Sequence, residues 1–142
     1  MNIRDFQKEV YHRNIEKGFY DYKEDLALAY EILYDRFVSE ESFEALSRIL
    51  TDYSKLQLER KLLLTIGELV EAHEELRAGH SPSEIYYNPE KPDKPEGFGV
   101  EIADAHIRLF DLEASRGIDS KANLELKSQY NAGRDYKHGR QF

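Results

Sequence analysis

The stretch at residues 68–73, Glu-Leu-Val-Glu-Ala-His, returns at residues 101–106 as Glu-Ile-Ala-Asp-Ala-His. Each copy places two acids three residues apart, and on an α-helix this spacing puts both side chains on one face, about 60° apart. If two such helices pack together, four carboxylates meet. The repeat therefore predicts an all-α protein, a helical bundle in which two antiparallel, adjacent helices carry the acid pairs Glu68/Glu71 and Glu101/Asp104.

Carboxylates gathered in this way need a cation. Two unpaired carboxylates about 4 Å apart repel by several kcal/mol at an effective dielectric constant near ~20. Oxygen ligands of this kind favour Mg²⁺, with Mn²⁺ as a possible substitute. The alternative is a solvated helix face, as for most helical glutamates. Against it, Glu71 has no basic residue three or four positions away, and the acids adjoin apolar residues such as Leu62, Ile66 and Leu69.

The histidines of the two repeats are not expected to be ligands. Both His73 and His106 come two residues after the second acid, about 200° around the helix, so they should lie on the opposite side. A di-iron bundle would need a glutamate three residues before each histidine, where this chain has Val70 and Ala103. The sequence therefore argues against a di-iron site.

Composition narrows the class of protein. A chain of 142 residues with 40% hydrophobic and 34% charged residues fits a single globular domain over residues 1–142. There is no cysteine for a disulfide or thiolate site, and no run long and apolar enough for a membrane span. A net charge of -8 argues against nucleic-acid binding. We expect a cytoplasmic protein. Residues 133–142 hold three fixed cations and one acid, which suit either a polyphosphate ligand or a solvated tail.

Hydrophobic periodicity predicts helices almost throughout. A capping box at Ser54 and Gln57 predicts the start of a long helix, and either Asp119 or Ser120 should cap the last one. The segment from Gly79 to Gly99 holds all four prolines and is predicted to be a long loop, either functional or a surface excursion. The predicted helices cover residues 2–16, 24–38, 40–51, 54–78, 99–116 and 120–131.

The acid motifs and their surroundings resemble the MazG-like superfamily of all-α nucleoside triphosphate pyrophosphohydrolases, whose signature is Glu-x-x-Glu followed by Glu-x-x-Asp. Residues 94–111, Lys-Pro-Glu-Gly-Phe-Gly-Val-Glu-Ile-Ala-Asp-Ala-His-Ile-Arg-Leu-Phe-Asp, are similar to one branch, as is Lys127-x-x-Tyr130-Asn131-x-x-Arg134-x-Tyr136-x-His138-Gly139. Residues 12–19 resemble the first helix of that branch. The resemblance covers residues 56–142 well; among the N-terminal helices, within residues 1–55, it covers residues 11–22 loosely and does not extend to residues 24–52. The gap between the acid motifs is longer than usual, and Arg140 stands where a glycine is expected.

The resemblance implies an enzyme that hydrolyses a nucleoside triphosphate to the monophosphate and pyrophosphate with Mg²⁺, and a homodimer or homotetramer. Glu71 would activate water. Tyr86, Tyr87 and Phe98 could stack on the base or, as aromatic residues more often do, belong to the core. The alternatives are a non-catalytic nucleotide-binding regulator and a protein-interaction module. The phosphate-binding residues would be Lys127, Asn131 and Arg134, which could instead serve only the helix C-terminus. The metal ligands would be Glu68, Glu71, Glu101 and Asp104.

Overall fold

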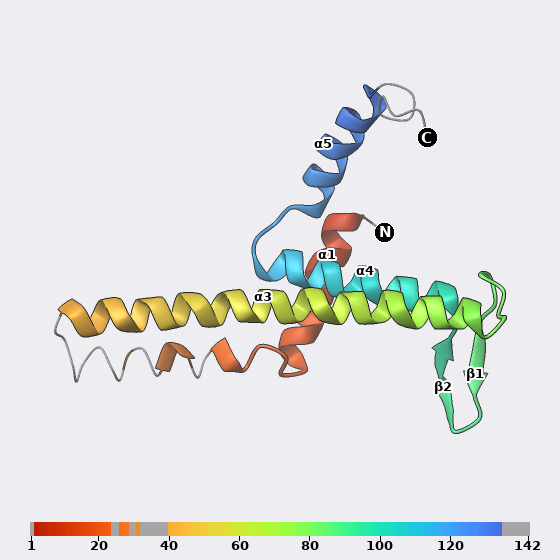
Figure 1. Cartoon of the computed structure of the whole chain (residues 1–142), viewed down its shortest axis with the longest axis horizontal. Helices are drawn as coiled ribbons and strands as arrows, with labels where there is room; N and C mark the ends of the chain where they lie inside the picture. Colours follow the sequence, from red (N-terminus) through yellow and green to blue (C-terminus); the bar gives the residue numbers. More distant parts are fainter. Residues whose placement is uncertain (1, 24–25, 29–30, 32–39, 135–142) are drawn as a thin grey trace.

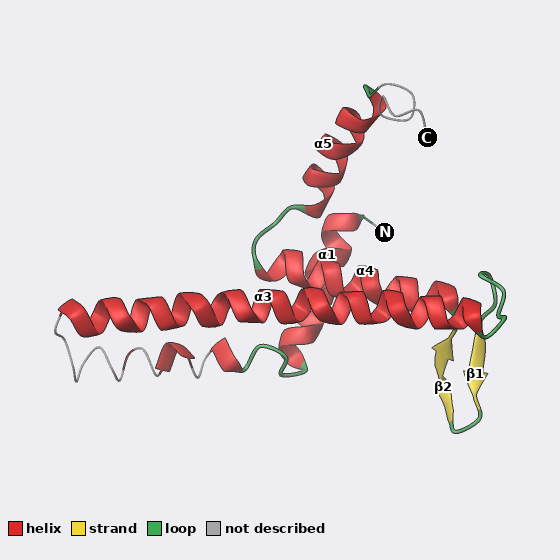
Figure 2. Ribbon diagram, viewed as in Figure 1, coloured by secondary structure: helices red, strands yellow, loops and turns green. Residues whose placement is uncertain are grey.

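The computed structural model describes residues 2–23, 26–28, 31 and 40–134, and these are mostly helical (Figure 2). The sheet is a two-stranded antiparallel hairpin. Most of the predicted helix at 24–38 and the tail beyond residue 134 lie outside the described residues. No helix in the described ranges is long and apolar enough to cross a membrane. In chain order the elements are α1 (Ile3–Glu16), α3 (Glu40–Arg77), β1 (Tyr86–Asn88), β2 (Lys91–Glu96), α4 (Phe98–Ser115) and α5 (Ser120–Ala132).

Helix α3 is one continuous helix of 38 residues, so the predicted break between residues 51 and 54 is wrong. The span contains no proline, and both hydroxyl residues near the expected break fit a helix interior. Thr51 donates to the carbonyl of Ser47 one turn back. The Ser54 hydroxyl accepts from Arg116, which is 62 residues away in the chain. Gly79, with φ of +90°, follows the helix end as predicted.

Helices α3 and α4 pack side by side and run in opposite directions, as predicted for the acidic helices (Figure 1). The small side chains Ala72 on α3 and Ala105 on α4 are both buried. Helix α1 packs on α4, where the Phe6 and Phe110 rings meet edge to face with centroids 5.7 Å apart. This three-helix contact positions the acid pairs.

The apolar residues beside the first acid pair face outward, contrary to expectation. Helix α3 buries Thr65, Glu68 and Ala72, whereas Leu62, Ile66 and Leu69 are exposed. The buried positions are three and four residues apart and therefore form one stripe on the helix. Because Glu68 belongs to that buried stripe, Leu62, Ile66 and Leu69 lie on other faces of the helix.

Helix α5 begins where predicted, with the Asp119 side chain accepting from the Ala122 amide. The same carboxylate pairs with Arg4 of α1, and Gln7 donates to the carbonyl of Ile118 at 2.7 Å. These contacts hold the start of α5 on α1. Figure 1 shows the rest of α5 projecting from the body.

The segment predicted to be a loop contains a β-hairpin. Its strands pair Tyr86 with Glu96 and Tyr87 with Pro95, and the Asn88 side chain accepts from the Glu90 amide to close the turn. Prolines are tolerated in β2 because a two-stranded sheet consists only of edge strands. The hairpin therefore lies beside the end of α3 and the start of α4 (Figure 1).

Candidate metal centre

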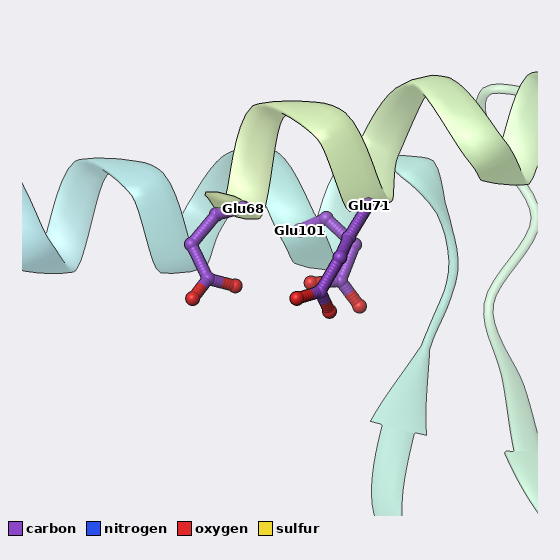
Figure 3. A group of neighbouring side chains, drawn as sticks. All are labelled: Glu68, Glu71 and Glu101. Atoms are coloured by element: carbon purple, nitrogen blue, oxygen red, sulfur yellow. The ribbon is translucent and has the colours of Figure 1, made fainter. Parts of the chain in front are cut away.

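Three of the four predicted metal ligands come together. Glu68 and Glu71 of α3 and Glu101 of α4 each offer a carboxylate oxygen, and these oxygens lie within 4.8 Å of one another. Figure 3 shows the three carboxylates projecting to the same side of the helix pair. Glu68 and Glu101 are 7% and 4% exposed, whereas Glu71 is open to solvent. Asp104, one turn along α4 and half-buried, is outside this group.

The acids raise one another's proton affinity. Burial, then the charge of Glu71, raises the pKa of Glu101 to about 7, against an ordinary value of 4.5. Burial, then the charge of Glu68, also raises the pKa of Asp104. A cation beside such a carboxylate would lower its pKa again, because a positive charge favours the ionised form.

Two cations reach the acids from positions that the sequence analysis missed. Arg108 of α4 donates from Nε to Oε1 of Glu68 at 2.6 Å. Lys94 of β2 lies 2.7 Å from Glu96, and its charge opposes the rise in the pKa of Glu101. Arg108 could have been found, since it follows Asp104 by four residues and so shares its helix face. Lys94 is brought close only by the hairpin.

A cleft of about 580 Å³, here called the hairpin cleft, lies between the end of α3 and the hairpin. Two of the three grouped acids, Glu71 and Glu101, line it. Tyr86 donates to Glu75 at 3.0 Å, and this hydrogen bond raises the pKa of Tyr86. Of the aromatic residues proposed to stack on a base, Tyr86 and Tyr87 line the cleft and Phe98 does not.

A second hollow of about 420 Å³, here called the aromatic cavity, opens further along α4. At its wall, Tyr20 and Lys61 both donate to Oδ2 of Asp111, at 2.7 and 2.5 Å. Burial, then the hydrogen bond to Asp111, raises the pKa of Tyr20. The cavity is lined by Asn14, Phe19, Tyr22, Tyr53, Gln57, Arg60, Lys61, Leu64, Asp104, Ile107, Arg108 and Asp111.

The predicted phosphate-binding residues lie elsewhere in the single chain. Lys127 and Asn131 are exposed on α5, and exposed Arg134 follows its end. Lys127 and Arg134 both lie over the Tyr130 ring, at 4.8 and 5.8 Å from its centroid. Helix α5 packs on α1 and projects away from the acidic part of α3 (Figure 1). Within one chain, these residues therefore do not lie beside the carboxylates.

The histidines stand as predicted, because both His73 and His106 are exposed and neither belongs to the acid group formed by the described residues.

No known protein family, curated protein or solved structure matches this chain. What the site does must therefore be inferred from its own geometry and chemistry.

Proposed function

We propose that this protein is a pyrophosphohydrolase that cleaves a nucleoside triphosphate between the α and β phosphates in the presence of Mg²⁺. The observation that carries the proposal is the meeting of Glu68, Glu71 and Glu101 from two antiparallel helices, with oxygens within 4.8 Å. Oxygen-only ligand sets suit Mg²⁺, and phosphoryl transfer depends on charge neutralisation and positioning. The described residues contain mainly helices, in keeping with a bundle of the MazG-like type.

The acids would divide the work by their burial. Buried Glu68 and Glu101 are fixed by packing between α3 and α4 and would hold the ion together with Glu71, with Asp104 one turn away as a fourth ligand. Exposed Glu71 lines the hairpin cleft, where it can accept a proton from the attacking water. Bound Mg²⁺ would neutralise phosphate charge and lower the pKa of that water.

The phosphate-binding role of α5 requires a second copy of the chain, since Lys127, Asn131 and Arg134 lie away from the carboxylates within one copy. We propose a homodimer or homotetramer. In support, the outer face of α3 exposes a run of large apolar side chains, and such a patch is typical of an interface. The residues are Leu62, Leu63, Ile66, Leu69 and Val70.

The test is product analysis with a panel of nucleoside triphosphates and Mg²⁺. Monophosphate and pyrophosphate should form in equal amounts, and none should form in chelator. Glu71→Gln should abolish turnover, whereas Glu9→Gln on the exposed face of α1 should not. Release of inorganic phosphate from the γ position, or full activity of Glu71→Gln, would refute the proposal. Tight binding of the triphosphate without turnover would favour a nucleotide-binding regulator instead.

A further inference from the structure

We propose that the aromatic cavity binds the nucleoside end of the substrate, so that the protein selects nucleotides over inorganic oligophosphates. This inference depends on the proposed function, because it takes the phosphates to lie at the carboxylates. Asp104 connects the two places: it is a candidate ligand one turn along α4 from Glu101, and it also lines the cavity. One helical turn is about 5 Å, so a phosphate at the acids leaves its nucleoside within reach of the cavity.

The size and lining of the cavity suit a planar base. Its volume of about 420 Å³ lies within the range of about 300–1,000 Å³ that is common for small-molecule sites. Tyr22 and Tyr53 line it with their rings edge to face and their centroids 6.0 Å apart. Phe19 also lines it and is 64% exposed, so its ring is accessible to a ligand in the cavity. Stacking on such rings stabilises a bound base by about 1–3 kcal/mol.

The charges that line the two hollows support the same division, with the phosphates at the acids and the nucleoside in the aromatic cavity. The hairpin cleft is lined by five glutamates and one lysine, a composition that tolerates phosphates only together with metal ions. The aromatic cavity contains three cations, Arg60, Lys61 and Arg108, although the whole chain has a net charge of -8. Lys61 and Arg108 pair with carboxylates, whereas Arg60 has no ion-pair partner among the described residues. Its guanidinium can therefore donate hydrogen bonds to the carbonyl oxygens and ring nitrogens of a base.

Asp111, which lines the cavity, also has an unused acceptor. Oδ1 of Asp111 is buried and has no hydrogen-bond partner within the described part of the chain. Both neighbouring donors, Tyr20 and Lys61, bind the other oxygen. An unsatisfied buried acceptor costs about 1–3 kcal/mol. Nucleobases and riboses carry the N–H and O–H donors that such an oxygen lacks, and inorganic phosphates at neutral pH offer few.

The hairpin cleft is the competing place for the base, and its aromatic surface is less available. The Tyr86 ring is already stacked on His80, with centroids 4.7 Å apart and planes at 16°, and its hydroxyl is bound to Glu75. Tyr87 is free to stack and is 58% exposed. It therefore provides a matched control for Phe19, because both are exposed aromatic side chains in the lining of a hollow beside the acids.

The experiment measures the dissociation constants of two Mg²⁺-bound ligands by calorimetry: a nucleoside triphosphate with a non-hydrolysable α,β-methylene bridge, and inorganic tripolyphosphate. Wild type should bind the nucleotide more tightly. Phe19→Ala and Tyr53→Leu should each weaken nucleotide binding by about 5-fold or more and leave tripolyphosphate binding unchanged. Tyr87→Ala, which tests the competing hairpin cleft, should weaken nucleotide binding less than either cavity variant does, and Glu9→Gln on the exposed face of α1 should change neither affinity. Circular dichroism checks that each variant is folded, and Phe19→Ala, at an exposed position, is the safer of the two.

Each other outcome has a definite meaning. Equal affinity of wild type for the two ligands, or no nucleotide binding, overturns the assignment of the cavity. So does weaker nucleotide binding in Tyr87→Ala with no change in the cavity variants, which would place the base in the hairpin cleft. The proposed hydrolysis fails separately: nucleotide binding that depends on Phe19 without turnover of the natural triphosphate supports the cavity and refutes the enzyme.

Discussion

Arg108 donates from Nε to Oε1 of Glu68 at 2.6 Å, so a buried candidate ligand of α3 is neutralised by an arginine of the facing helix α4. A metal ion at the acid group would have to share this carboxylate with the guanidinium. The pair thus links the stability of the metal-free protein to its affinity for metal.

Removal of the arginine should destabilise the metal-free protein and increase its response to metal. We expect Arg108→Gln to lower the free energy of unfolding in chelator by about 1–2 kcal/mol, less than for a fully buried pair because Arg108 is partly exposed. Millimolar Mg²⁺ should then raise the melting temperature more than in wild type, since it replaces the lost counter-charge. Arg77→Gln, which breaks an exposed pair with Glu74, is the control. Identical Mg²⁺ responses in Arg108→Gln and wild type would place the metal away from Glu68.

Stability in chelator should depend on pH through Glu101. Its pKa of about 7 in the folded protein exceeds the ordinary 4.5, so the folded state binds the proton more tightly than the unfolded state. The contribution of Glu101 to the free energy of unfolding should therefore be greatest below pH 4.5 and fall by up to about 3 kcal/mol as the pH rises through 7.

Glu101→Gln should remove this dependence, because it keeps the shape of the side chain without the charge. Denaturant unfolding in chelator should show the variant more stable than wild type at about pH 8 and close to it at about pH 5. Glu9→Gln, at an exposed position, should show no such crossover. A stability difference that is the same at both pH values would contradict the buried charge.

The ion pair behind the aromatic cavity should be important for folding. Lys61 lies 2.5 Å from Asp111, which is almost fully buried, so Lys61→Met should cost about 3–5 kcal/mol by leaving an unpaired buried charge. The double variant with Asp111→Leu should recover most of that loss. Lys55→Met, which breaks an exposed pair with Asp52, should change stability by about 0.5 kcal/mol or less. Chemical denaturation measures all three, and a small effect of Lys61→Met would mean that water reaches Asp111.

A glycine at the start of α4 should control the placement of Glu101. Gly97 has φ of +132°, and a Cβ there would lie 2.4 Å from the carbonyl oxygen of Glu84. Gly97→Ala should therefore cost about 1–3 kcal/mol or more and weaken the Mg²⁺ response, since the Glu101 amide donates to the Gly97 carbonyl. Gly99→Ala, where the nearest atom is 3.7 Å away, is the matched control in the same helix turn region. Thermal unfolding with and without Mg²⁺ decides, and equal effects of the two substitutions would refute the strain.

Features that depend on near neighbours in the chain could be predicted from the sequence. The ends of α1, α4 and α5 agree with the predictions within about two residues, because Gly18, Gly117 and the Asp119 cap act on adjacent backbone groups. The spacing of the acids also sufficed to put Glu68, Glu71 and Glu101 together once two helices packed.

Features that depend on partners distant in the chain could not be predicted in this way and are seen only in the folded protein. Ser54 resembles a helix start, but α3 continues through it and the hydroxyl binds Arg116, 62 residues away. The hairpin forms within a segment whose prolines predicted a loop, and it alone brings Lys94 to the acids. The aromatic cavity is lined by residues from three separate segments, around Phe19, Tyr53 and Ile107. Such contacts form only when helices pack, because the free energy of burial and ion pairing comes from residues that no local pattern relates.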